Sequence, residues 1–325
     1  MIAPYLLRLV CVSLALFFAI HTVAGAVVAL CGAAAVRTAR NMRPRFAGRF
    51  LLALRLLPAA LALVLVVGIC VPSYLWLEPE SKAEEVGMAC LAAAVAAAAI
   101  LSLSLARGLR AATRTNRHSQ RYAMAGHRSS LPGWPQPFWI LEARGPLFAL
   151  VGVFRPRVVI SQAVIGALSP GQLDAALRHE ESHRISRDNL KRLVMLLTPG
   201  LLPGVHGFTA IERGWVRFSE WAADDAAVAG DAHRSLFLAA ALVRIARMSG
   251  GVAPAPPLAA SFLGDSLEIS ARVDRLLMPA PAIPAPPRDL AWTAGGFAFA
   301  AACAAFMLHP VTLESAYRII EEVIH

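Results

Sequence analysis

Four runs of apolar residues, each about 20 residues or longer, are separated by polar segments, and a run of this length can cross a bilayer as a helix. They cover residues 9–36, 51–77, 86–106 and 290–308. The third run is mostly alanine, so we expect its insertion to depend on packing against neighbouring helices. The pattern predicts a mainly α, polytopic membrane protein with about four transmembrane helices, three of them within residues 1–106.

Composition and cysteine placement agree with a membrane protein. Hydrophobic residues make up 57% of the 325 positions and the mean hydropathy is +0.58, which exceeds what a soluble core needs. The first run is too long for the apolar core of a signal peptide, so we expect it to be retained. All five cysteines lie inside apolar runs, which argues against a disulfide framework and against a thiolate metal site.

The distribution of arginine predicts the orientation. Five arginines lie between the first two runs and six lie between residues 107 and 128, whereas the loop LEPESKAEE after the second run is acidic. Because short loops rich in Lys or Arg stay in the cytoplasm, we expect the N-terminus outside, residues 107–289 in the cytoplasm and the short tail 309–325 outside. Attraction to anionic lipid explains most of the net charge of +10. The bilayer is therefore the expected partner, and no motif suggests a nucleic-acid partner.

The cytoplasmic region is expected to contain a basic linker, 107–137, followed by a domain over 138–285. The stretch LFALVGVFRPRVVIS predicts a short β-hairpin. In SPGQLDAALRHEESHR, Ser169 is suited to cap a helix, Pro170 to begin it and Gln172 to complete a capping box. The pattern therefore predicts a helix that carries His179 and His183.

Two histidines four residues apart on a helix face the same way and can bind one metal ion. Glu180 lies at the flank of that face and could act as a general base toward an attacking water. Zn²⁺, one ion per chain, suits such chemistry. The alternative to a metal site is a solvent-exposed helix face that carries two histidines and two glutamates without a shared function.

A catalytic zinc needs a third protein ligand, and RFSEWAADDAAVAG supplies a candidate. Glu220 begins an alanine-rich helical stretch, and Asp224 lies one turn later on the same face, where it could orient a ligating histidine. Asp225 competes for that second role but is rotated about 100° away. The predicted site is therefore His179, His183 and Glu220 around the metal, with Glu180 as the catalytic residue.

These stretches, with ARVDRLL at 271–277, resemble the BlaR/MecR-type membrane metallopeptidases and, more distantly, the HtpX and CAAX-prenyl-type proteases. The resemblance implies a zincin-like helical metalloprotease domain in a bacterial cell membrane, with the same ligands and base. Arg187 and Asp188 match the family's tail after the motif and are expected to fix the helix end. The substrate would be a protein or peptide, for example a cytosolic repressor. The tail 309–325 is too short to fold as an extracellular penicillin-binding domain, so we do not expect a β-lactam sensor.

The expected function is a membrane zinc metalloendopeptidase, with a non-catalytic signalling protein that binds a cytosolic regulator as the alternative. We expect an extended substrate to pair with the edge of the strand at 157–161. The segment 193–211, which contains His206, is broken by Pro and Gly and is expected to be re-entrant or interfacial. Within the spans, Arg55 is expected to snorkel toward water. For His21, helix packing and a signalling role remain open.

Overall fold

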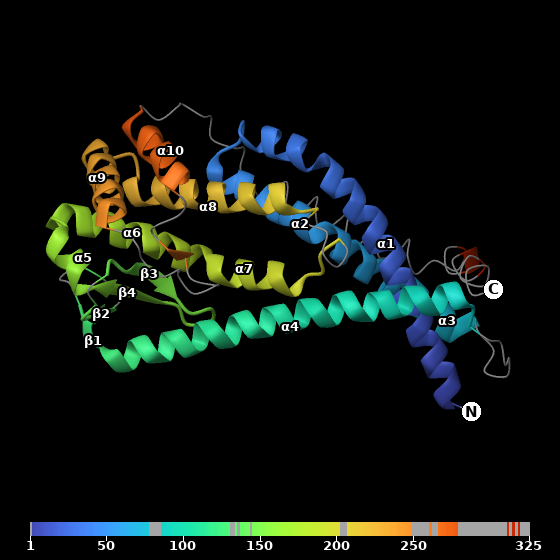
Figure 1. Ribbon diagram of the computed structural model, residues 1–325. Helices are drawn as coiled ribbons and strands as arrows, with labels where there is room; N and C mark the ends of the chain where they lie inside the picture. Colours follow the sequence, from blue (N-terminus) through green and yellow to red (C-terminus); the bar gives the residue numbers. More distant parts are fainter. Residues whose placement is uncertain are drawn as a thin grey trace.

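The computed structural model describes residues 2–77, 86–130, 134, 137–143, 145–201, 207–248, 260–261 and 266–278, together with positions 311, 314, 315 and 318. The described chain is mainly helical with a small sheet (Figure 1). The fourth predicted span, 290–308, and most of the tail 309–325 lie outside the described residues.

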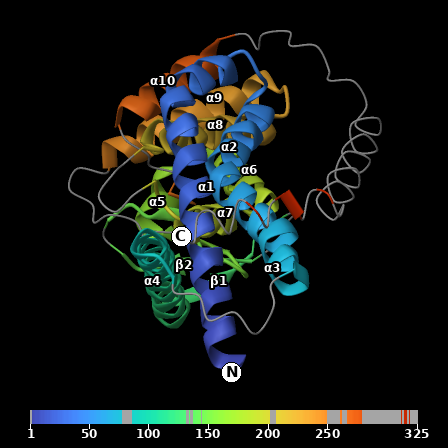
Figure 2. The same cartoon turned by 90° about the vertical axis from the view of Figure 1, so that its right-hand side faces the viewer.

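Three helical segments are long and apolar enough to cross a membrane, and they coincide with the first three predicted runs. The first is α1 (Ile2–Ala39). The second is α2 (Pro44–Leu65), which continues through one π-helical turn, η1 (Val66–Cys70), into α3 (Val71–Leu77). The third is α4 (Met88–Ala125). Viewed from the membrane-helix end, α1 lies beside α2 and α3, with α4 on its other side (Figure 2).

The predicted linker differs most from the structure. α4 continues for 38 residues without a break to Ala125, so residues 107–125 are helical. The small residues Gly108, Ala111 and Thr115 are buried on one face of this extension, at the spacing of three and four residues that an amphipathic helix requires. No proline occurs between 107 and 131. The high density of arginine concealed a helix that carries the chain from the membrane bundle to the sheet.

The sheet contains five short strands in the order β1-β2-β4-β3-β5. They are β1 (Gly126–Ser129), β2 (Phe138–Leu141), β3 (Phe148–Val151), β4 (Arg157–Ser161) and β5 (Ala260–Ser261). The antiparallel pairing of β3 with β4 confirms the predicted hairpin. However, β4 also pairs in parallel with β2. Both edges of β4 are therefore occupied, and the expected pairing of a substrate with this strand is wrong.

Helices lie against the sheet (Figure 1). They are α5 (Gln162–Ala167), α6 (Pro170–Ser186), α7 (Asp188–Leu197), α8 (Thr209–Val228), α9 (Ala232–Met248) and α10 (Ser266–Leu277). Two of them, α6 and α8, carry the motif residues. α6 begins with the predicted capping box: the Ser169 hydroxyl accepts from the Gln172 amide, and the Gln172 side chain accepts from the Ser169 amide. The helix that carries Glu220 starts eleven residues before it, at Thr209.

Helix α8 passes through two hydrophobic cores. Its first half, including Ile211, Trp215 and Phe218, packs with α1 and α2. Near its end, Ala227 belongs to the core formed by the sheet, α6 and α9. Glu220 and Asp224 lie between these two apolar regions, so neighbouring packing on both sides fixes the segment of α8 that carries the carboxylates.

The segment 193–211 turns back rather than continuing as a helix. α7 ends at Leu197 and α8 begins at Thr209, while Leu201 and Phe208 pack in the core formed with α1 and α2. Residues 202–206, including His206, lie outside the described part. Because the chain returns, α6 and α8 pack directly against each other, as the re-entrant interpretation expected.

Both ionisable residues that the sequence analysis singled out within the spans contact this turn. His21 Nε2 lies 2.8 Å from the carbonyl oxygen of Gly200, which agrees with the packing interpretation of this histidine. Arg55 does not snorkel: it is 4% exposed and donates to the carbonyl oxygens of Met195, Thr198 and Pro199. The expectation was wrong because the end of α7 and the turn after it supply hydrogen-bond acceptors within the protein, where the sequence suggested only lipid.

Candidate metal centre

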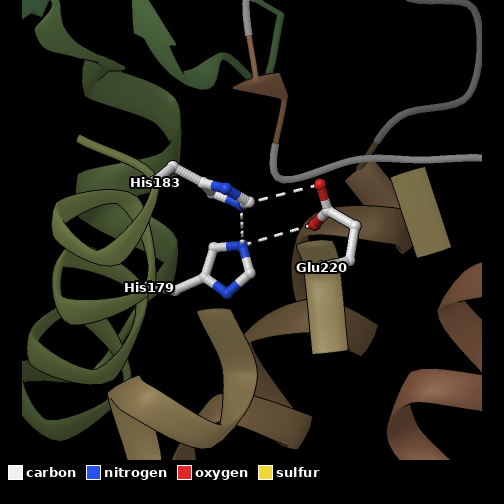
Figure 3. A group of neighbouring side chains, drawn as sticks. All are labelled: His179, His183 and Glu220. Carbon is white, nitrogen blue, oxygen red and sulfur yellow. Dashed lines mark hydrogen bonds and ion pairs between the residues drawn. The ribbon is translucent and has the colours of Figure 1, made fainter. Parts of the chain in front are cut away.

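His179 and His183 meet on the inner face of α6, as their spacing predicted (Figure 3). Both side chains are buried. Their rings are nearly perpendicular, with centroids 4.7 Å apart. The two Nε2 atoms are 3.1 Å apart and point into the same space. Two imidazole lone pairs can therefore converge on one position.

Glu220 reaches the same position from α8 (Figure 3). Its two carboxylate oxygens lie 3.4 Å from His179 Nε2 and 3.5 Å from His183 Nε2. One donor atom from each of the three residues falls within 4.8 Å of the others. This buried group could hold a metal ion.

A carboxylate lies against the second nitrogen of each histidine. Asp224 Oδ1 is 2.9 Å from His179 Nδ1, in the position proposed for it from its spacing to Glu220. Asp188 Oδ2 is 2.7 Å from His183 Nδ1. A carboxylate can only accept, so each Nδ1 carries a proton, and Nε2 is the nitrogen that can bind a metal once its own proton is lost. Asp225 instead pairs with Arg275, with 2.6 Å between the nearest atoms.

The contact of Asp188 corrects the role expected for the Arg-Asp-Asn tail. Arg187 adopts a left-handed conformation, with φ of 55°, which ends α6 and starts α7. The Asp188 side chain therefore turns back to His183 in addition to marking the helix boundary. Asn189 donates to the carbonyl oxygens of Leu150 and Gly152. The tail thus fixes the orientation of a candidate ligand and joins α7 to β3.

Glu180 is fully buried, and neither of its carboxylate oxygens has a hydrogen-bond partner among the described residues. Burial raises the pKa of this carboxyl to about 7, although His179 and His183 act in the opposite direction. A buried carboxylate without a partner is costly. A buried carboxyl with a raised pKa next to two histidines is typical of a functional group rather than of packing.

Arg272 on α10 is the main feature that the sequence analysis missed. Its side chain is 2% exposed and forms a bidentate pair with Asp224, with N–O distances of 2.6 and 2.9 Å. Its Nη1 lies 3.1 Å from Glu220 Oε2. In the sequence, the segment ARVDRLL was notable only for its family resemblance, and no role was predicted for Arg272. A long-range contact over 48 residues leaves no local signal beyond an arginine on an amphipathic helix.

Charge compensation dominates the electrostatics of the centre. Burial would lower the pKa of His183, but Glu220 and Asp188 raise it to about 10. Burial would raise the pKa of Glu220, but His183, His179 and Arg272 hold it well below its usual range. Glu220 therefore stays ionised although it is buried.

The donor set fits a catalytic zinc ion. Two imidazoles and one carboxylate leave a fourth position open in known catalytic zinc sites. The Nδ1 contacts with Asp188 and Asp224 provide the outer carboxylates that such ligands commonly have. The unpartnered Glu180 carboxylate lies beside the proposed ligands in the chain and has the chemistry of a proton acceptor.

Comparisons with protein-family models, with curated proteins and with solved structures find no match to this chain.

Proposed function

We propose that the protein is a membrane-embedded zinc-dependent endopeptidase. The observation that carries the proposal is the convergence of His179, His183 and Glu220 within 4.8 Å, next in sequence to the fully buried Glu180. The same set, with imidazole and carboxylate donors, also suits non-haem iron. The adjacent buried Glu180 carboxyl favours hydrolysis, because it has no hydrogen-bond partner among the described residues and can act as a general base toward water.

The residues would share the reaction as follows. Bound by His179, His183 and Glu220, zinc would polarise the scissile carbonyl and increase the acidity of water. Glu180 would take a proton from the attacking water and later donate it to the leaving amine. Asp188 and Asp224 would hold the imidazoles in the ligating tautomer.

The resemblance to the BlaR/MecR-type metallopeptidases supports the same proposal. It adds a protein or peptide substrate, for example a cytosolic repressor, and a site on the cytoplasmic side of a bacterial membrane. The rival, a signalling protein with a metalloprotease-like scaffold, does not require Glu180. A buried carboxylate that has no described partner favours the enzyme.

The test compares metal content and cleavage in the full-length protein purified in detergent. Wild type, Glu220→Gln and Glu180→Gln are analysed for bound metals by elemental analysis and incubated with unfolded casein. We expect about one zinc per chain in wild type. Glu220→Gln should lose the zinc, because it removes the anionic ligand. Glu180→Gln should retain the zinc and lose cleavage, because it removes only the base.

Glu181→Gln is the matched control, because this neighbouring glutamate pairs with Arg184 rather than with the centre. It should keep both zinc and cleavage. Iron in place of zinc in wild type would overturn the proposed chemistry. Full cleavage by Glu180→Gln would remove the assigned base, and zinc-loaded wild type without any cleavage would favour the signalling protein.

A further inference from the structure

The turn between β3 and β4 lies beside the part of α4 that leaves the membrane. Val153 in this turn packs against Ala111 of α4 and Leu193 of α7. Ala111 is five residues beyond the end of the apolar run at Ala106, so it lies about 7.5 Å further along the helix. Headgroup layers extend roughly 5–8 Å beyond the hydrocarbon on each side. The turn is therefore at the level of the lipid headgroups.

The exposed residues of this turn match a membrane surface. Phe154 is 81% exposed, although most large aromatic side chains are buried on folding. Arg155 follows it and is also exposed. An aromatic ring beside a cation is the pairing that proteins commonly present at the boundary between hydrocarbon and headgroups.

A basic pocket opens at the same end of the sheet. Its volume is about 390 Å³, and its lining includes Arg128, Trp139, Arg155, Arg157, Glu181 and Arg184. The strand register explains the location, because β1 ends where β2 begins, and β4 begins beside β2. Arg157 lies over the Trp139 ring, with its guanidinium carbon 4.8 Å from the ring centroid. Glu181 is already paired with Arg184, which leaves three arginines in excess over carboxylates.

We propose that the β3–β4 turn docks on the membrane surface, with Phe154 at the acyl boundary and the basic pocket occupied by an anionic phospholipid headgroup. Exposed arginines bind anions weakly one at a time, but several near an anionic leaflet act together. A soluble phosphate site would be expected to use backbone amides at a helix start, and the pocket is lined by α6 only from Leu177 to Arg184, past its first turn.

This docking would connect lipid to the candidate metal centre. Leu177, Glu181 and Arg184 are spaced four and three residues apart and line one face of α6. His179 and His183 point from the other face. A headgroup in the pocket would thus lie behind the helix that carries the two histidines. The proposal rests on the membrane-spanning assignment of α4 and not on the proposed peptidase activity.

The test is hydrogen exchange of the full-length protein in nanodiscs. Peptides covering 148–161 are followed in phosphatidylcholine discs and in discs containing phosphatidylglycerol. We expect wild-type amides in this segment to exchange more slowly in the anionic discs. Arg155→Gln should lower that lipid-dependent protection about fivefold, because each basic residue near an anionic surface contributes on the order of a fivefold gain. Phe154→Ser should reduce protection in both lipids.

Arg244→Gln on α9 is the matched control, since this arginine is exposed and lies on a helix that does not line the basic pocket. It should exchange like wild type. A third arm adds inorganic pyrophosphate to the phosphatidylcholine discs. Protection of 148–161 by pyrophosphate equal to that by anionic lipid would identify a soluble-anion site and overturn the membrane docking. Identical exchange in the two lipids would overturn it as well.

Discussion

The guanidinium of Arg272 and the carboxylate of Asp224 form a buried bidentate pair, with Nη2–Oδ1 and Nε–Oδ2 distances of 2.6 and 2.9 Å. Asp224 in turn contacts His179 Nδ1. α10 is therefore connected through one carboxylate to a candidate metal ligand on α6. α10 therefore forms part of the wall of the candidate centre. We expect a substitution on α10 that removes this pair to alter the position of the candidate ligand His179.

Replacing Arg272 by Gln should destabilise the protein by about 3–5 kcal/mol, the range observed when one partner of a buried ion pair is removed. The loss arises because Asp224 and Glu220 remain buried without their cation. Thermal unfolding in detergent, followed by tryptophan fluorescence, measures the effect. The double variant Arg272→Gln/Asp224→Asn should recover part of it, because the uncompensated charge of Asp224 is then absent.

Arg275→Gln provides the comparison on the same helix. Arg275 pairs with Asp225, but the side chains are 28% and 47% exposed, so this pair is expected to contribute less than about 1 kcal/mol. If Arg272→Gln were no more destabilising than Arg275→Gln, the buried pair would not contribute the expected ~3–5 kcal/mol to the free energy of unfolding.

The contacts of the two Nδ1 atoms predict effects on metal affinity. Asp188→Asn and Asp224→Asn each remove the anionic partner of one histidine and should weaken zinc binding about 10- to 100-fold. Competition with a fluorescent chelator at fixed pH measures the dissociation constant. Asp174→Asn is the control, because Asp174 lies on the same helix as the histidines but pairs with the exposed Arg178. Equal affinities in all three variants would contradict the orienting role of the two carboxylates.

Local patterns in the sequence were sufficient to predict the helix of the motif. The spacing of His179 and His183, the cap at Ser169 and the two short β-rich runs that form β3 and β4 each depend on residues within one element, and each element is present. The approach of Glu220 was inferred only because catalytic zinc needs a third ligand. Its place between two cores depends on the packing of α8, which no local pattern specifies.

The missed features are contacts between distant elements. Arg272, Arg55 and the central position of β4 all depend on tertiary partners 40 or more residues away or on strands that the pattern did not predict. An arginine in an apolar segment can snorkel to water or cap a buried helix end, and the sequence near it is the same in both cases. Which of the two occurs depends on whether another element supplies hydrogen-bond acceptors to the arginine.

The pKa of Glu180 predicts a pH-dependent effect on stability in protein stripped of metal by a chelator. The carboxyl is raised from 4.5 to about 7 in the folded state. Below pH 4.5 it is neutral in both states and adds no penalty. Between pH 4.5 and 7 the unfolded chain loses the proton first, so folding stability falls, by about 3 kcal/mol in total.

Glu180→Gln removes this titration, so the stripped variant should unfold at a higher temperature than wild type at pH 8 and at the same temperature near pH 4.5. Thermal scans at both pH values measure the difference in unfolding temperature between wild type and Glu180→Gln. The contributions of the other titrating groups are largely the same in the two proteins and therefore cancel in this difference. A stability gain that is equal at pH 4.5 and pH 8 would mean that ionisation is not its cause.

Arg55 links a membrane helix to the turn between the two metal-site helices, and its removal should be costly. The side chain caps the last carbonyls of α7 and lies 2.6 Å from Glu212 of α8. Arg55→Met should cost about 2–3 kcal/mol, since hydrogen bonds from a charged donor to buried acceptors are lost. Arg55→Lys should rescue little of it, because an ammonium cannot reproduce the planar fork.

Thermal unfolding gives the size of the loss, and hydrogen exchange over 193–201 gives its location, because the uncapped end of α7 should exchange faster than in wild type. Arg49→Met is the control on the same helix, where the arginine is exposed and contacts only the Phe46 ring, at 5.9 Å, among the contacts that the structure records for it. Zinc content should also fall in Arg55→Met, since the turn sets the approach of α8 toward α6. If Arg55→Met and Arg49→Met had the same unfolding temperature and unchanged hydrogen exchange over 193–201, Arg55 would be an ordinary snorkelling residue. The membrane helices would then not stabilise the candidate metal site through Arg55.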